Sequence, residues 1–273
     1  MPARRDPSEN AGMNSQQPPT AAAPSPADPS APPLMPDTLQ WLPALGRPEQ
    51  LMLLLHGWGA SAADMAPLAM TLRQAFPQAA LLAPQGFDAA DGTGGPGRQW
   101  FSVAGVTEAN RPARVAAVLP RLAAWVRAAQ SATGLGPAAT ALVGFSQGAI
   151  SALELVQQED GIAGRVLSFS GHYASLPETA PQHTTLHFFH GAADVVIPAE
   201  QARLAIERLS GLHGDATIDI AEGLGHALPP SLMSVAIERL RSHIPHRTWK
   251  AAMGQVPGLA QREARDAGLG DED

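Results

Sequence analysis

Cysteine is absent from this chain of 273 residues. The absence excludes disulfide bridges, thiolate nucleophiles, and zinc or iron–sulfur centres that are built on cysteine. It also fits a reducing compartment, and we therefore expect the protein to be cytoplasmic.

Long apolar runs and an excess of basic charge are also missing. No run approaches the roughly 20 residues that span a bilayer, and no apolar stretch of a secretory signal follows Arg4 and Arg5. The formal net charge of −7 argues against nucleic acid or an anionic membrane as the main partner. We expect a small-molecule substrate, no nucleic acid and no stable membrane insertion, and the assembly stays open between monomer and homodimer.

The composition divides the chain into three parts. Residues 1–37 are rich in proline and alanine and have few larger apolar side chains, so we expect a disordered tail. Residues 249–273 end in three acidic residues and are expected to be a partly disordered tail. Residues 38–248 form the predicted folded domain.

Short apolar runs alternate with longer amphipathic segments through this domain. Strands without polar alternation are typical of a sheet that is buried on both faces. Alternation of strands and helices favours an α/β fold with a mostly parallel central sheet and helices on both faces. We predict strands at 51–55, 79–83, 139–145, 166–169, 186–189 and 217–221, and helices at 63–75, 111–132, 147–158, 199–212 and 231–243.

One serine has the surroundings of a nucleophile. Ser146 lies in Gly144-Phe145-Ser146-Gln147-Gly148, a G-x-S-x-G pattern between a predicted strand and a predicted helix. The glycines permit a tight turn, and the helix N-terminus faces the carbon where negative charge would develop. The alternative reading is a chance match to the pattern, which the strand before Ser146 and the helix after it argue against. Ser170 also follows a predicted strand, but no predicted helix begins after it.

A serine hydroxyl needs a histidine to accept its proton and a carboxylate to hold that histidine. In α/β-hydrolases the order along the chain is serine, acid, histidine. Asp194 follows the strand that ends near His190, and His226 follows the last strand in a glycine-containing loop. We favour these two residues over the rival carboxylates and the rival base, which are Asp160, Asp215, Asp219 and His172.

The loop His56-Gly57-Trp58-Gly59 follows the first buried strand and can turn the amide of Trp58 toward a substrate carbonyl. The amide of Gln147 would be the second donor of an oxyanion hole, whereas His56 is expected to brace the loop.

Three further pairs of residues lie outside these motifs. Trp100 and Phe101, in a long insertion over 85–110, either line an acyl slot or anchor the loop. No joint metal site is expected from His187 and His190, which should point to opposite faces of one strand. We expect His243 and His246 to face solvent.

These segments together resemble the phospholipase/carboxylesterase family, which includes the acyl-protein thioesterases, and especially its small bacterial esterases. The resemblance spans about residues 48–247. It rests on Leu53–Gly59, Arg98–Phe101, Gly144–Gly148, His190-Gly191 with Asp194, and Gly225-His226.

The resemblance implies an α/β-hydrolase without a large cap domain, and a triad of Ser146, Asp194 and His226. It also implies oxyanion donors at Trp58 and Gln147, with no metal or cofactor. Many members of the family have leucine where Trp58 stands, and the larger ring would narrow the acyl pocket.

The activity that it implies is hydrolysis of short-to-medium-chain carboxylic esters through an acyl-enzyme. Thioesters or lysophospholipids are alternative substrates for the same triad. A non-catalytic binding protein on a hydrolase scaffold is the alternative from another class.

Overall fold

A computed structural model describes residues 37–254 of the chain. The predicted N-terminal tail, apart from Asp37, lies outside the described residues, as does the C-terminal tail beyond residue 254.

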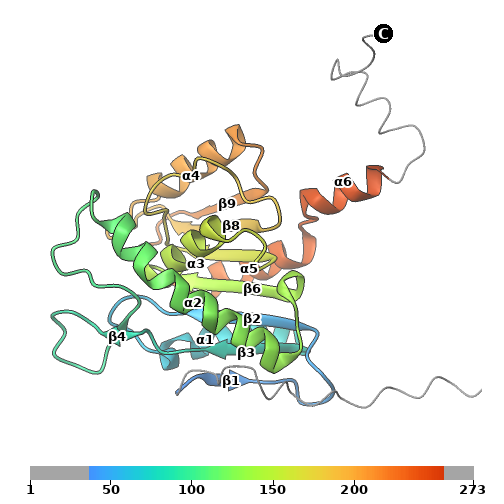
Figure 1. Ribbon diagram of the computed structural model, residues 1–273, viewed down its shortest axis with the longest axis horizontal. Coiled ribbons are helices and arrows are strands. Elements are labelled where there is room, and N and C mark those ends of the chain that lie inside the picture. Colours follow the sequence, from blue (N-terminus) through green and yellow to red (C-terminus); the bar gives the residue numbers. More distant parts are fainter. Residues whose placement is uncertain (1–36, 255–273) are drawn as a thin grey trace, which may run out of the picture.

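A seven-stranded sheet forms the centre of the molecule (Figure 1). Its order is β1-β3-β2-β6-β7-β8-β9, and only the β1–β3 pair is antiparallel. The strands are β1 (Leu39–Trp41), β2 (Gln50–Leu55), β3 (Ala79–Ala83), β6 (Thr140–Phe145), β7 (Arg165–Phe169), β8 (Thr185–Gly191) and β9 (Ala216–Ala221), and a separate antiparallel pair consists of β4 (Asp88–Ala89) and β5 (Arg98–Gln99).

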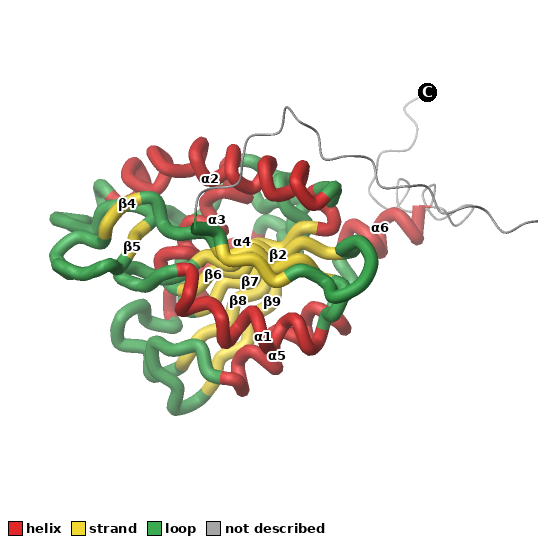
Figure 2. Tube along the Cα trace, turned by 90° about the horizontal axis from the view of Figure 1, so that it is seen from below, coloured by secondary structure: helices red, strands yellow, loops and turns green. Residues whose placement is uncertain are grey.

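Helices cover both faces of the sheet (Figure 2). One apolar core joins α2, α3 and α4 to the sheet, and a second core joins α1 and α5 to the opposite face. The helices are η1 (Ala62–Met65), α1 (Ala66–Ala75), α2 (Arg111–Thr133), η2 (Pro137–Ala139), α3 (Gln147–Gln158), α4 (Glu200–Gly211), α5 (Pro230–Ser242) and α6 (His246–Gly254). None of the helices within residues 37–254 is both long and apolar enough to cross a bilayer.

The predicted α/β fold is confirmed, and each predicted strand and helix is present with shifts of one or two residues at its ends. The segment expected as one helix at 63–75 begins with the 3-10 turn η1 before α1. Sequence reasoning missed β1, the β4–β5 pair and α6. All four are short, and β1 is largely exposed, so none has the long apolar pattern on which the predictions relied.

The order of the strands fixes where a site can form. After β2 the chain moves outward to β3, and it then returns to place β6 on the other side of β2. The loops after β2 and β6 therefore diverge at the carboxyl edge of the sheet, where open α/β sheets bind ligands.

Candidate active site

Ser146 stands at this divergence, in a sharp turn between β6 and α3. Its backbone has φ 52° and ψ −117°, a conformation that is strained for a residue with a side chain. The Ser146 amide donates a hydrogen bond of 2.9 Å to the carbonyl of Phe169 at the end of β7. The turn is thus held in place by the neighbouring strand.

The two glycines of the pentapeptide are required by close packing. A Cβ atom at Gly144 would lie 2.4 Å from the amide nitrogen of Ala149 in α3. A Cβ at Gly148 would lie 2.1 Å from the carbonyl oxygen of Leu55 in β2. Any larger residue at either position would push α3 away from the sheet, so the motif supports the position of Ser146 through backbone contacts.

A continuous line of hydrogen bonds joins the serine to a carboxylate. The Oγ of Ser146 lies 2.9 Å from Nε2 of His226, and Nδ1 of His226 donates to Oδ2 of Asp194 over 2.7 Å. The loops after β6, β8 and β9 thus bring together the three residues that the sequence singled out. Such a relay can accept a hydroxyl proton and stabilise the resulting imidazolium.

Asp194 is buried and held in its ionised form. Burial opposes its charge, but the amides of Ile197 and Val196 and the ring of His226 outweigh that effect and lower the pKa of the carboxyl group. Both amides donate to Oδ1 over 2.9 Å, whereas Oδ2 accepts from His226 over 2.7 Å and has Nε2 of His190 3.4 Å away. The carboxylate is therefore fixed with one oxygen aimed at the imidazole.

Within residues 37–254, the backbone amides of Trp58 and Gln147 beside Ser146 have no acceptor. Gln147 is the first residue of α3, so its amide has no acceptor within the helix. In the loop after β2, the amides of Gly59 and Ala60 donate to the carbonyls of Arg98 and Gly57. The Trp58 amide donates to no carbonyl in the described part of the chain.

His56 braces this loop, as its position predicts. Its Nδ1 donates to the carbonyl of Gly57 over 2.7 Å, and its Nε2 accepts the amide of Gly86 over 2.8 Å. Burial lowers the pKa of His56, so the ring stays neutral and can both donate and accept.

The side chain of Gln147 has a role that the sequence did not indicate. Its Oε1 accepts the amide of Trp100 over 2.8 Å, and its Nε2 donates to the carbonyl of Phe101 over 2.7 Å. Trp100 is fully buried and donates its indole N–H to the carbonyl of His56. Of the two readings for Trp100, the structure shows the anchoring role, and the only hint in the sequence was its place in a long insertion.

A pocket of about 520 Å³ opens beside the serine. Phe101 and the half-exposed Trp58 line it, whereas Trp100 does not. Six further lining residues are mostly apolar and come from the 85–110 insertion, α2, α3 and the loop after β8: Val103, Val106, Arg111, Ile150, Val196 and Ile197.

His172, the rival base, takes no part in the relay. Its Nδ1 donates to the carbonyl of Tyr173 over 2.6 Å. Burial lowers the pKa of His172, and the charge of Arg111 lowers it further.

The rival carboxylates have structural partners instead. Asp160 accepts the amides of Gln182 and His183, and Asp219 forms a two-pronged ion pair with Arg239 of α5.

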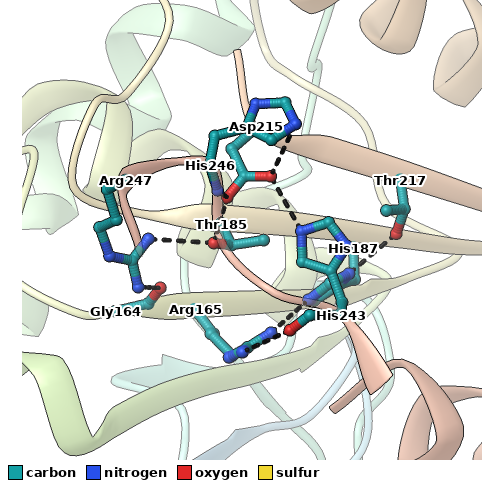
Figure 3. A network of polar contacts seen from close by, with 9 residues as sticks. All are labelled: Gly164, Arg165, Thr185, His187, Asp215, Thr217, His243, His246 and Arg247. Atoms are coloured by element: carbon teal, nitrogen blue, oxygen red, sulfur yellow. Dashed lines mark hydrogen bonds and ion pairs between the residues drawn. The ribbon is translucent and has the colours of Figure 1, made fainter. Parts of the chain in front are cut away.

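The third rival, Asp215, immediately precedes β9 and so lies at the opposite, amino-terminal edge of the sheet, within the polar network drawn in Figure 3. It accepts hydrogen bonds from Nε2 of His243, the hydroxyl of Thr185 and the amide of His246. The expectation that His243 faces solvent is therefore wrong, because the Asp215 carboxylate at the start of β9 draws its ring inward. His246 is exposed as expected, with its ring 3.8 Å from the same carboxylate.

The histidines of β8 are held apart by separate partners. His187 contacts Thr217 and Arg165, whereas His190 donates to the carbonyl of Ile197 near the triad. Within residues 37–254, no group of three or more His, Cys, Asp or Glu side chains is arranged to hold a metal ion.

The fold and this relay define a serine hydrolase of the α/β-hydrolase type. The sequence profile of the Phospholipase/Carboxylesterase family matches residues 43–244. The chain therefore belongs to the phospholipase/carboxylesterase family and is a carboxylic ester hydrolase, as the sequence predicted.

Individual relatives agree with this assignment. The chain is 46% identical to esterase YpfH of Escherichia coli (strain K12) over 212 residues, which cover 77% of this chain and 90% of the relative. It is 31% identical to acyl-protein thioesterase 1 of Gibberella zeae over 121 residues, 41% of this chain and 52% of that protein. The crystal structure of esterase PE8 superposes with a TM-score of 0.66 at 29% identity, covering 76% of this chain and 98% of PE8.

Proposed function

We propose that Ser146, His226 and Asp194 form the catalytic triad of a serine carboxylesterase. The single observation that carries the proposal is the unbroken hydrogen-bonded line from the serine hydroxyl to a buried carboxylate. Ser146 attacks the ester carbonyl while His226 takes its proton, and the ionised Asp194 stabilises the imidazolium.

The reaction then proceeds through an acyl-enzyme. The amides of Trp58 and Gln147 donate to the oxygen that becomes negative, and each such donor is typically worth about 3 kcal/mol in the transition state. His226 returns the proton to the departing alcohol. Water, deprotonated by His226, attacks the acyl-enzyme and releases the carboxylic acid, which restores the serine hydroxyl. No metal or cofactor enters these steps.

The substrates that we propose are esters of short-to-medium-chain acids. Trp58 and Phe101 contribute apolar surface beside the nucleophile, which suits an acyl chain. A thioesterase or lysophospholipase reading uses the same machinery, and the similarity to a protein called acyl-protein thioesterase 1 supports keeping it as the second candidate.

A chain-length series of p-nitrophenyl esters, set beside acyl thioesters of the same lengths, tests the proposal. We expect hydrolysis of the esters by the wild type and no measurable turnover by a folded Ser146→Ala variant. Labelling by a fluorophosphonate probe gives an independent readout of Ser146. A folded wild-type protein that is neither labelled nor active would overturn the assignment.

The choice of base is tested by two variants. His226→Ala should lose turnover, whereas His172→Ala should keep it, because His226 contacts the serine hydroxyl and His172 does not. The reverse pattern would make His172 the base.

We further propose the cytoplasm as the compartment, on the ground of composition given above. The assembly stays open between monomer and homodimer, and light scattering of the purified protein decides between them.

A further inference from the structure

The pocket beside Ser146 contains a charged group that the triad chemistry does not use. Arg111, the first residue of α2, lines the pocket together with apolar side chains. Among the described residues that line the pocket, Arg111 is the one with a permanent charge, and none is an aspartate or a glutamate. A cation on an apolar wall is costly to dehydrate unless the bound molecule supplies an opposite charge.

The guanidinium of Arg111 is left without a partner by the described part of the chain. Within residues 37–254 it forms neither an ion pair nor a side-chain hydrogen bond. Arg114 lies one turn further along α2 and differs sharply, because its guanidinium donates to the carbonyls of Ser102 and Ala104 over 3.0 and 2.7 Å. Arg114 therefore braces the insertion, and Arg111 is left available to a ligand.

The electrostatic setting also favours an anion at Arg111. The residue is half-buried, and its charge helps to lower the pKa of the neighbouring His172, which burial lowers first. His172 thus stays neutral and does not compete for an anion.

We propose that Arg111 binds an anionic group of the substrate, a carboxylate or a phosphate, that lies several atoms from the scissile carbonyl. The inference rests on the proposed esterase function and names the class of ester that the site prefers. Arginine recognises both anions through paired N–H donors, and its aliphatic stem continues the apolar wall. Arg111 is thus a specificity-determining residue that contacts substrate and takes no part in bond making.

Matched esters test the carboxylate. Mono-p-nitrophenyl adipate carries a carboxylate at the far end of its acyl group, and p-nitrophenyl hexanoate is its neutral counterpart. We expect wild-type kcat/KM to favour the adipate, and Arg111→Met to lower the adipate-to-hexanoate ratio by about tenfold to hundredfold, since hydrogen bonds to charged groups are lost. Arg111→Lys should retain part of the preference.

A second arm tests the phosphate. Release of hexanoate from hexanoyl-glycerol 3-phosphate is compared with release from hexanoyl-glycerol, in the same variants. A preference that depends on Arg111 in the first arm identifies a carboxylate on the acyl side. The same dependence in the second arm identifies a phosphate on the alcohol side.

Arg203→Met is the matched control, because Arg203 is exposed on α4 and away from the pocket. It should leave both ratios as in the wild type. The proposal is overturned if the wild type shows no anionic preference in either arm, or if Arg111→Met keeps the preference.

Calorimetric binding of adipate and of neutral hexanamide separates this inference from the proposed function. Tighter binding of adipate that Arg111→Met removes would support the inference even if no ester were hydrolysed. Equal binding by wild type and Arg111→Met would refute it even if hexanoate esters were cleaved rapidly.

Discussion

Two aspartate–histidine pairs lie at opposite edges of the same sheet. At the carboxyl edge, Asp194 accepts from His226 over 2.7 Å, after β8 and β9 respectively. At the amino edge, just before β9, Asp215 accepts from His243 over 2.9 Å. Residue type and distance barely distinguish the pairs, so their different consequences come from what surrounds them.

The third group decides what each pair can do. The second nitrogen of His226 faces the hydroxyl of Ser146, which opens onto a pocket. Near Asp215 the available hydroxyl belongs to Thr185, and it donates to the carboxylate instead of to an imidazole. The first pair can move a proton toward a substrate, whereas the second ties the α5–α6 connection to the start of β9.

The largest expected effect is a loss of catalytic rate on changing Asp194, and its failure to appear would break the comparison between the two pairs. Asp194→Asn should lower kcat by about 10⁴-fold, as loss of the orienting carboxylate does in other triads. The remaining carbonyl oxygen can still accept the amides of Val196 and Ile197, so the fold should persist. Steady-state kinetics with a p-nitrophenyl ester and circular dichroism check the two parts, and near-normal turnover would contradict the assigned role.

The matched change at the other edge should affect stability alone. In Asp215→Asn the neutral amide replaces an acceptor that binds His243, Thr185 and the amide of His246. We expect the free energy of unfolding to fall by about 1–3 kcal/mol, with kcat/KM of the wild type. Urea unfolding measures the free energy of unfolding, and the same ester assay measures kcat/KM. A large loss of activity in a folded variant would show that the two edges are coupled.

The smallest expected effect is on the pH dependence of the free energy of unfolding, to which His187 in the amino-edge network contributes. Burial, reinforced by the charge of Arg165, lowers the pKa of His187 to about 3. The Nδ1 of His187 donates to the hydroxyl of Thr217, and its Nε2 accepts from the guanidinium of Arg165. A second proton would have to bind at Nε2, where it would meet the N–H donor of Arg165 and no acceptor. The unfolded chain takes up this proton below its ordinary pKa of 6.5, and stability is therefore lost as the pH falls from there toward 3.

His187→Gln cannot take up that proton, so its loss of stability on acidification should be smaller. Between pH 7 and 5.5 we expect the wild type to lose about 1 kcal/mol more than the variant. Urea titrations at the two pH values measure the difference. Parallel losses in both proteins would show that His187 does not contribute.

Much of the site followed from sequence because it depends on chain order and strand ends. The strand before Ser146 and the helix after it defined the turn, and Asp194 and His226 each followed a buried strand. Local patterns of this kind carry their own structural context.

The rest depended on contacts between distant segments. The inward turn of His243 needs the carboxylate of Asp215, 28 residues earlier in the chain. Likewise, only the packing of the insertion shows that Phe101 lines the pocket while Trp100 lies in the core. The sequence does not indicate that Arg111 lines the pocket, since no local pattern distinguishes an arginine that begins a helix from one that enters a pocket.

The side chain of Gln147 joins the insertion over 85–110 to the turn that carries the nucleophile. It clamps the backbone at Trp100 and Phe101, while its own amide stands next to the nucleophile. A remodelled insertion would therefore shift the catalytic centre as well as the specificity wall. A redesign of substrate specificity should therefore keep the two side-chain hydrogen bonds of Gln147 and change pocket residues outside the insertion, such as Val196 and Arg111.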